Sequence, residues 1–171
     1  GSVVVTDSKR LYKIYNGYST DEPFTVNPKT GDSVEGNYPD TDRLIPDLEG
    51  EFVVTIDVEQ TLNALKAMKI IVKENGDTYN KIIHIKSENG VLYFTAGNES
   101  SPLQMTYKAG QLDVNHGDKS ITANSEFILE TLDFLKDSGL KEINFNFYDE
   151  LKPFTFTGKD VTTLILPVRE G

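Results

Sequence analysis

The pattern on which the fold depends lies in residues 51–68, EFVVTIDVEQTLNALKAM. Its first six residues read as a strand. Asp57 follows as a good helix N-cap, with Gln60 at the capping-box position. Four apolar residues then recur at helical spacing: Val58, Leu62, Leu65 and Met68. The stretch predicts a strand that leads directly into a helix with one buried face.

The same strand–helix pattern occurs a second time further along the chain. Ile121 leads into ANSEFILETLDFLKDSG, residues 123–139, where Asn124 reads as the N-cap and Gly139 as the stop. A stripe at helical spacing predicts the buried face: Ile128, Leu132 and Leu135. The sequence therefore predicts two helices, each preceded by a strand.

Three predicted strands follow each helix. After the first helix, residues 80–97 form two alternating strands joined through Asn89-Gly90, and residues 101–110 form a third. After the second helix, the strands are residues 141–148, 154–158 and 161–168. This order predicts an α+β fold of two helix-on-antiparallel-sheet units with internal pseudo-symmetry.

The first 50 residues have a different character. Residues 3–5 and 11–15 read as the two strands of a hairpin. Residues 17–50 are rich in Gly, Pro, Asp, Asn and Thr, which is typical of turns, short strands and an extended linker.

Composition excludes several functions. The net charge of −10 argues against a surface that wraps nucleic acid, although a local basic face is compatible with it. The absence of cysteine excludes disulfides, thiolate metal sites and thiol catalysis. No apolar run approaches a membrane span and nothing resembles a signal peptide, so we expect a soluble cytoplasmic protein without membrane contact.

The sequence contains few residues that could form a catalytic site. His84 reads as a strand residue and His116 as a turn residue, which leaves no evident Ser-His-Asp triad or zinc site. Asp40 and Asp42 read as a solvated linker turn rather than a cation site, and Gly31–Ser33 only faintly resembles an esterase block. We therefore expect no catalysis, cofactor or metal, with a hydrolase kept as a weakly supported alternative.

Three stretches together resemble one family, the bacterial sliding clamps, which are the β subunit of DNA polymerase III. They are VVVTDSKRL (3–11), VEGNYPDTDRLIP (34–46) and LILPVR (164–169). Residues 54–68 and 121–135 resemble helix-bearing parts of the clamp's third domain. The resemblance implies a partial clamp-like subdomain and linker in residues 1–46 and a complete C-terminal clamp-like domain in residues 51–169, either as part of a longer clamp or as a shortened homologue.

The resemblance also implies a function without chemistry. Such clamps are processivity factors in DNA replication, with helices facing the inside of a ring and sheets its outside. They bind the polymerase, repair enzymes and loaders through Gln-x-x-Leu-Phe-like peptides. For this chain it implies homo-oligomers and non-specific contact with double-stranded DNA.

Carried over residue by residue, the three motifs imply one peptide-binding groove. Its predicted residues are Thr6, Ser8, Lys9, Arg10, Leu11, Pro39, Arg43, Leu44, Leu164, Leu166, Pro167 and Arg169. The leucines could line an apolar slot for a Leu-Phe pair with the prolines as stiff walls, and the arginines could hydrogen-bond peptide carbonyls. Ordinary packing between a domain and its linker is the alternative interpretation of these residues.

The predicted helices differ in charge. Lys66, Lys69 and Lys136 are the candidates for DNA contact. The second helix, however, carries four acidic residues and one lysine, Lys136. The acidic residues are Glu126, Glu130, Asp133 and Asp137. This acidic face favours a second hypothesis, in which the chain is a clamp-derived regulatory or interaction protein that does not encircle DNA.

Overall fold

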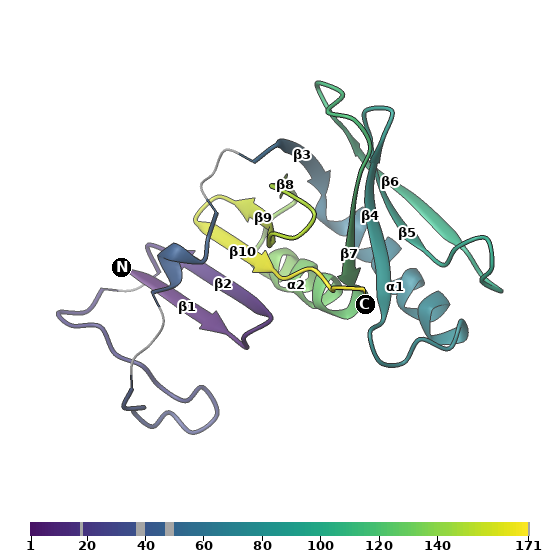
Figure 1. The fold of residues 1–171 in the computed structure, drawn as a ribbon. Coiled ribbons are helices and arrows are strands. Elements are labelled where there is room, and N and C mark those ends of the chain that lie inside the picture. Colours follow the sequence, from purple (N-terminus) through teal and green to yellow (C-terminus); the bar gives the residue numbers. More distant parts are fainter. Residues whose placement is uncertain (18, 37–39, 47–49, 171) are drawn as a thin grey trace.

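Two antiparallel sheets and two helices form the fold in a computed structural model, which describes residues 1–17, 19–36, 40–46 and 50–170 (Figure 1). The larger sheet contains, in spatial order, β1 (Ser2–Thr6), β2 (Arg10–Tyr15), β10 (Val161–Ile165), β9 (Phe154–Gly158), β8 (Glu142–Phe147) and β3 (Phe52–Asp57). The smaller sheet contains β6 (Met105–Gln111), β5 (Val91–Ala96), β4 (Ile82–Glu88) and β7 (Lys119–Asn124). The helices are α1 (Val58–Glu74) and α2 (Ser125–Asp137), and a 3-10 turn, η1, spans Thr41–Arg43.

The local signals in the sequence specify how the helices begin and end. Asp57 accepts a hydrogen bond from the N–H of Gln60 (2.8 Å), and Asn124 accepts from the N–H groups of Glu126 (2.9 Å) and Phe127 (3.2 Å). Gly139 follows α2 with a φ of 84°, a conformation that favours glycine. The predicted caps and the stop are confirmed.

Each predicted unit contributes one strand to the sheet of the other. The strand before α1, β3, pairs with β8 of the second unit. The strand before α2, β7, pairs with β4 of the first. The two units are therefore interleaved, although the predicted α+β architecture of helices on antiparallel sheets is confirmed.

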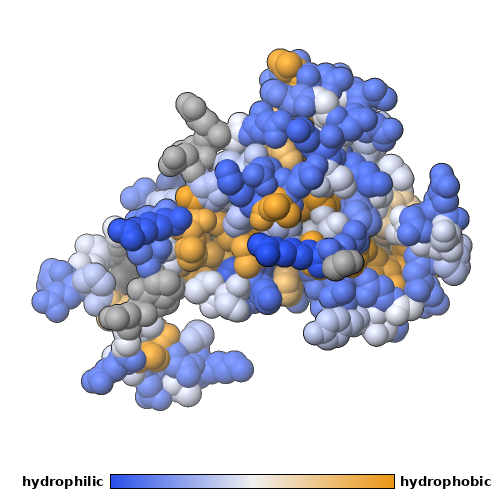
Figure 2. Space-filling model, in the orientation of Figure 1, coloured by the Kyte–Doolittle hydropathy of each residue, from blue (hydrophilic) through white to orange (hydrophobic). Residues whose placement is uncertain are grey.

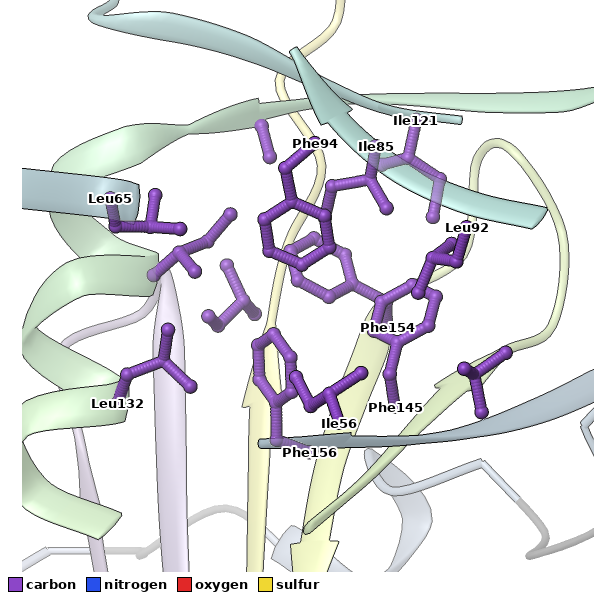
Figure 3. Close-up of a cluster of buried hydrophobic side chains, with 14 of the residues drawn as sticks. Ile56, Leu65, Ile85, Leu92, Phe94, Ile121, Leu132, Phe145, Phe154 and Phe156 are labelled. Atoms are coloured by element: carbon purple, nitrogen blue, oxygen red, sulfur yellow. The ribbon is translucent and has the colours of Figure 1, made fainter. Parts of the chain in front are cut away.

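The two sheets and the two helices share one hydrophobic core (Figure 3). Both predicted helix stripes are buried in it, with Val58 at 1% exposure and the other six residues at 0%. Phe145 on β8 lies at its centre, with ring centroids 6.4 Å from Phe94 of the smaller sheet, 5.9 Å from Phe154 and 5.6 Å from Phe156. In the described part of the chain, no helix is long and apolar enough to span a membrane.

The N-terminal hairpin extends the larger sheet. β2 pairs antiparallel with β10, so that Leu11 lies opposite Leu164 and Lys13 opposite Thr162. Tyr12 on the other face of β2 stacks on Phe134 of α2, with ring centroids 4.9 Å apart. The predicted boundary between residues 1–46 and 51–169 thus runs through a continuous sheet, between β2 and β10.

The last strand is shorter than predicted. The sequence pattern predicts residues 161–168, whereas β10 ends at Ile165. Pro167 has no N–H to donate to a neighbouring strand, which explains why pairing stops before it. The chain then leaves the sheet and runs beside β7 and β4 (Figure 1).

Candidate peptide-binding site

The turn between β1 and β2 is held by its own side chains. The Thr6 hydroxyl donates to the carbonyl of Arg10 (2.7 Å), and Asp7 accepts from the N–H groups of Lys9 (3.0 Å) and Arg10 (2.8 Å). Ser8 has a φ of 68° at the apex. This Asx-type turn fixes the backbone and leaves the side chains of Thr6, Ser8 and Lys9 exposed to solvent.

Arg10 is engaged within the protein. Its guanidinium donates to Asp7 through Nε (3.0 Å) and Nη2 (2.8 Å) and to Glu130 of α2 through Nη1. It also lies over the ring of Phe127, 4.5 Å from the centroid. Peptide carbonyls would therefore meet a guanidinium that already donates three hydrogen bonds within the protein. Phe127 and Glu130 join the candidate site, although the sequence did not indicate them.

The pKa values in this turn follow from those contacts. Burial alone would raise the pKa of Asp7, but hydrogen bonds from the Arg10 side chain and from the N–H groups of Lys9 and Arg10 bring it below its ordinary value. Burial opposes the charge on Arg10, yet the carboxylates of Glu130 and Asp7 raise its pKa overall. Both side chains therefore stay charged at neutral pH.

The four predicted leucines form a buried pair and an exposed pair. Leu11 and Leu164 lie opposite each other in the sheet and are 2% and 4% exposed. Leu44 and Leu166 are 49% and 37% exposed. The N–H of Leu166 donates to the carbonyl of Lys9 (3.0 Å), which places the segment after β10 against the β1–β2 turn.

The linker reaches the same sheet through η1. Arg43 is 86% exposed at its side chain and pairs with Asp40 in the same turn (3.0 Å). Asp42 pairs with Lys13 of β2, and Thr41 is buried. Asp40 and Asp42 thus have separate cationic partners, and the predicted Pro39 lies outside the described residues.

The C-terminal segment completes the arrangement. The N–H of Val168 donates to the carbonyl of Thr122 on β7 (2.8 Å), and Glu170 lies 3.6 Å from His84 of β4. Pro167 is half-buried and Arg169 is exposed. In Figure 2 apolar surface gathers in the middle of this face, with strongly hydrophilic side chains on both sides of it.

All three motifs therefore lie along β2: the segment after β10 contacts the turn before β2 at Lys9, and the linker contacts β2 at Lys13. The contacts of Lys13, Thr122, Phe127 and Glu130 were not predicted. The one available signal was that Lys13 shares a strand face with Leu11. The described residues hold no group of three or more His, Asp or Glu side chains that could bind a metal ion.

The predicted DNA-contacting lysines are largely paired with acids across the two helices. Lys69 of α1 lies 3.3 Å from Glu126 of α2, and Lys136 of α2 lies 3.2 Å from Glu59 of α1. Each contact joins the N-terminal part of one helix to the C-terminal part of the other. The two helices therefore run antiparallel. Lys66 is exposed and, among the described residues, forms no ion pair.

The stability that Glu126 contributes to this helix pair depends on pH. A hydrogen bond from Lys81, supported by Lys69, lowers the pKa of Glu126 below its ordinary value of 4.5. A carboxylate with a depressed pKa stabilises the fold above its unfolded-state pKa, and this stabilisation disappears as the pH falls through the folded-state value. Glu126→Gln is therefore expected to reduce the loss of stability in acid by at most about 1 kcal/mol, the range of solvent-screened pairs.

Urea unfolding at about pH 7 and about pH 3 measures this difference. Glu88→Gln is the matched control, because Glu88 forms no ion pair among the described residues. Equal losses in acid for Glu126→Gln and the unmodified chain would contradict the assigned role of Glu126.

The chain is similar to known proteins in both sequence and fold. No family model matches the chain. It is 30% identical over 141 residues to the beta sliding clamp of Staphylococcus aureus, covering 80% of this chain and 35% of that protein. The beta sliding clamp of Staphylococcus epidermidis matches with the same identity and coverage. The chain therefore spans about a third of the length of these relatives.

Solved structures show the same fold. The β chain of DNA polymerase III from Streptococcus pneumoniae superposes with a TM-score of 0.81 at 20% identity, over 99% of this chain and 54% of that chain. The β subunit from Pseudomonas aeruginosa superposes with a TM-score of 0.77 at 20% identity, over 97% of this chain and 54% of that chain.

Proposed function

Because the chain is a homologue of the bacterial β sliding clamp over a domain-sized portion and has the DNA-clamp fold, we propose that it tethers replication or repair proteins through a peptide-binding groove. The family is a non-catalytic accessory subunit of DNA polymerase III. One observation carries the proposal: the hydrogen bond from Leu166 to Lys9, which brings the C-terminal segment against the β1–β2 turn.

The exposed residues of the site suit an extended peptide with an apolar end. Leu44 and Leu166 are exposed and offer apolar surface for the proposed groove, and the Leu11–Leu164 pair is buried in the larger sheet. Burying a peptide Leu-Phe pair is worth roughly 1.5–3 kcal/mol for each side chain. After the cost of ordering the peptide, this apolar burial supports a modest affinity.

Charge at the rim supports the same partner class. Arg43 is 86% exposed at its side chain and pairs only within its own turn among the described residues. Arg169 is also exposed and has no ion pair among the described residues. These two guanidinium groups can hydrogen-bond peptide carbonyls or acidic neighbours of the Leu-Phe pair.

Titration of the chain with a labelled Gln-x-x-Leu-Phe peptide tests the proposal. We expect saturable binding, and loss of it when the Leu-Phe pair is replaced by Ala-Ala. The same affinity for both peptides, or no saturation, would contradict a groove built for apolar side chains.

A second function is favoured by the helix pair. Two of the three candidate DNA-contacting lysines are paired with glutamates, and α2 carries four acids against one lysine. Phosphate contacts require available cations. We therefore also propose a regulatory alternative, in which the chain occupies or competes for clamp-binding peptides without encircling DNA.

Circular DNA distinguishes the two functions. A ring built from this chain would need several copies, so the mass in solution is measured first by light scattering. An encircling clamp is then expected to stay on nicked circular DNA and to leave it after linearisation. Absence of retention on either DNA supports the regulator.

A further inference from the structure

Lys13 is a buried cation on the outer face of the larger sheet. The residue is 8% exposed, and its neighbours in register are Val4 on β1 and Thr162 on β10. Lys13 and Leu11 share the strand face that points away from α2, since Tyr12 between them packs on that helix. An ammonium group at such a position requires compensation, because burying a charge without a partner is strongly unfavourable.

The compensation comes from the linker. The Lys13 ammonium pairs with Asp42 in η1 and lies 5.1 Å from the centroid of the Tyr15 ring. Among the described residues, Asp42 is its sole ion-pair partner. Asp42 itself remains 73% exposed at its side chain, so water can solvate it without Lys13. Lys13 therefore depends on this ion pair more than Asp42 does.

The turn that carries Asp42 is small and internally bonded. The N–H of Arg43 donates to the carbonyl of Asp40 (3.3 Å), and the N–H of Leu44 donates to that of Thr41 (3.1 Å). Thr41 is buried at 8% exposure beside this ion pair. Figure 1 shows this segment passing over the β1–β2 end of the larger sheet.

Arg43 and Leu44 come directly after Asp42. The position of their exposed side chains therefore depends on the placement of this turn. Arg43 contacts Asp40 of the same turn, which moves with it. If η1 left the sheet, the buried ammonium would lose its counter-ion. The ion pair thus selects one placement of the turn, a role for which buried charges are suited.

We propose that Lys13 is a positioning residue that holds η1 against the sheet through Asp42 and thereby places Arg43 and Leu44 at the groove. The consequence for peptides rests on the proposed function. The placement of the turn does not, and it can be measured without any peptide.

Hydrogen exchange of the Arg43 and Leu44 amides tests the placement. Lys13→Met removes the charge and keeps most of the length of the lysine side chain. Asp42→Asn removes the charge of the aspartate and keeps its shape. Both variants are expected to lower the protection of these amides about fivefold, the effect of a pair with one exposed partner. Lys13→Arg should restore protection, whereas a merely structural requirement for a lysine-shaped side chain would not predict this rescue. Lys119→Met is the matched control, because Lys119 pairs with Glu51 (3.3 Å) on another part of the surface.

Peptide titration of the same variants tests the consequence. The Kd for the Gln-x-x-Leu-Phe peptide should rise about fivefold in Lys13→Met and return in Lys13→Arg. Unchanged protection of the turn overturns the proposal, and so does lowered protection with an unchanged Kd. If the unmodified chain binds no peptide, the proposed function fails, and the exchange data alone still decide whether Lys13 holds the turn.

Discussion

The Leu166→Asp variant is expected to bind the Gln-x-x-Leu-Phe peptide at least about 30-fold more weakly than the unmodified chain. Leu166 is 37% exposed, so a peptide side chain can cover it. Losing that contact removes roughly 1.5–3 kcal/mol of apolar burial. The complex would also have to desolvate the new carboxylate, which adds to the loss. Fluorescence polarisation with a labelled peptide measures the two Kd values.

The fold itself should tolerate this change. Leu166 contributes its backbone N–H to Lys9, which aspartate retains, and its side chain lies outside β10. Leu103→Asp is the control, because Leu103 is 45% exposed in the loop between β5 and β6. Circular dichroism checks that both variants are folded. Equal affinity of Leu166→Asp and Leu103→Asp would show that the apolar surface at Leu166 takes no part in binding.

Phe145→Ala is expected to lower the free energy of unfolding by about 3–5 kcal/mol, the usual cost of removing a buried aromatic side chain. Phe145 is fully buried and meets rings of both sheets, since Phe94 lies on β5 and Phe154 on β9. The cavity would open where the sheets join, which limits how far either one can relax into it. Urea unfolding should show a midpoint lower by roughly 1–3 M.

Val53→Ala is the matched control for this prediction. Val53 lies on β3, which pairs with β8, but its side chain is 45% exposed. Its loss should cost less than about 0.5 kcal/mol, as for most surface changes. Should Phe145→Ala fail to fold, Phe145→Leu removes less volume and is expected to cost about 1–2 kcal/mol. A cost below that of Val53→Ala would contradict a core shared by the two sheets.

Local patterns in the sequence were sufficient to predict the helices and the order of the strands. Asp57 and Asn124 each cap the predicted helix, and Asn89-Gly90 joins β4 to β5. These signals act over a few residues, because a cap or a tight turn satisfies backbone groups next to it in the chain. The α+β class and the order of elements followed from them.

Pairing between distant strands could not be predicted in the same way. Val54 on β3 and Phe145 on β8 lie opposite each other although they are far apart in the sequence. The local sequence of either strand does not indicate which other strand it pairs with. Strand register depends on which apolar faces come together when the whole core forms. The interleaving of the two units is therefore a property of the assembled core.

The same division holds for the candidate site. The sequence by itself determined that three motifs carry the clamp resemblance, that Arg10 and Arg43 belong to them, and that the second helix is acidic. The tertiary structure alone decided that Arg10 is held by Glu130, that Lys13 is buried against Asp42, and that antiparallel packing pairs Lys69 with Glu126. The physical reason is that a charge is visible in the sequence, whereas its counter-ion is fixed only when folding brings distant segments within a few ångströms and removes the water between them.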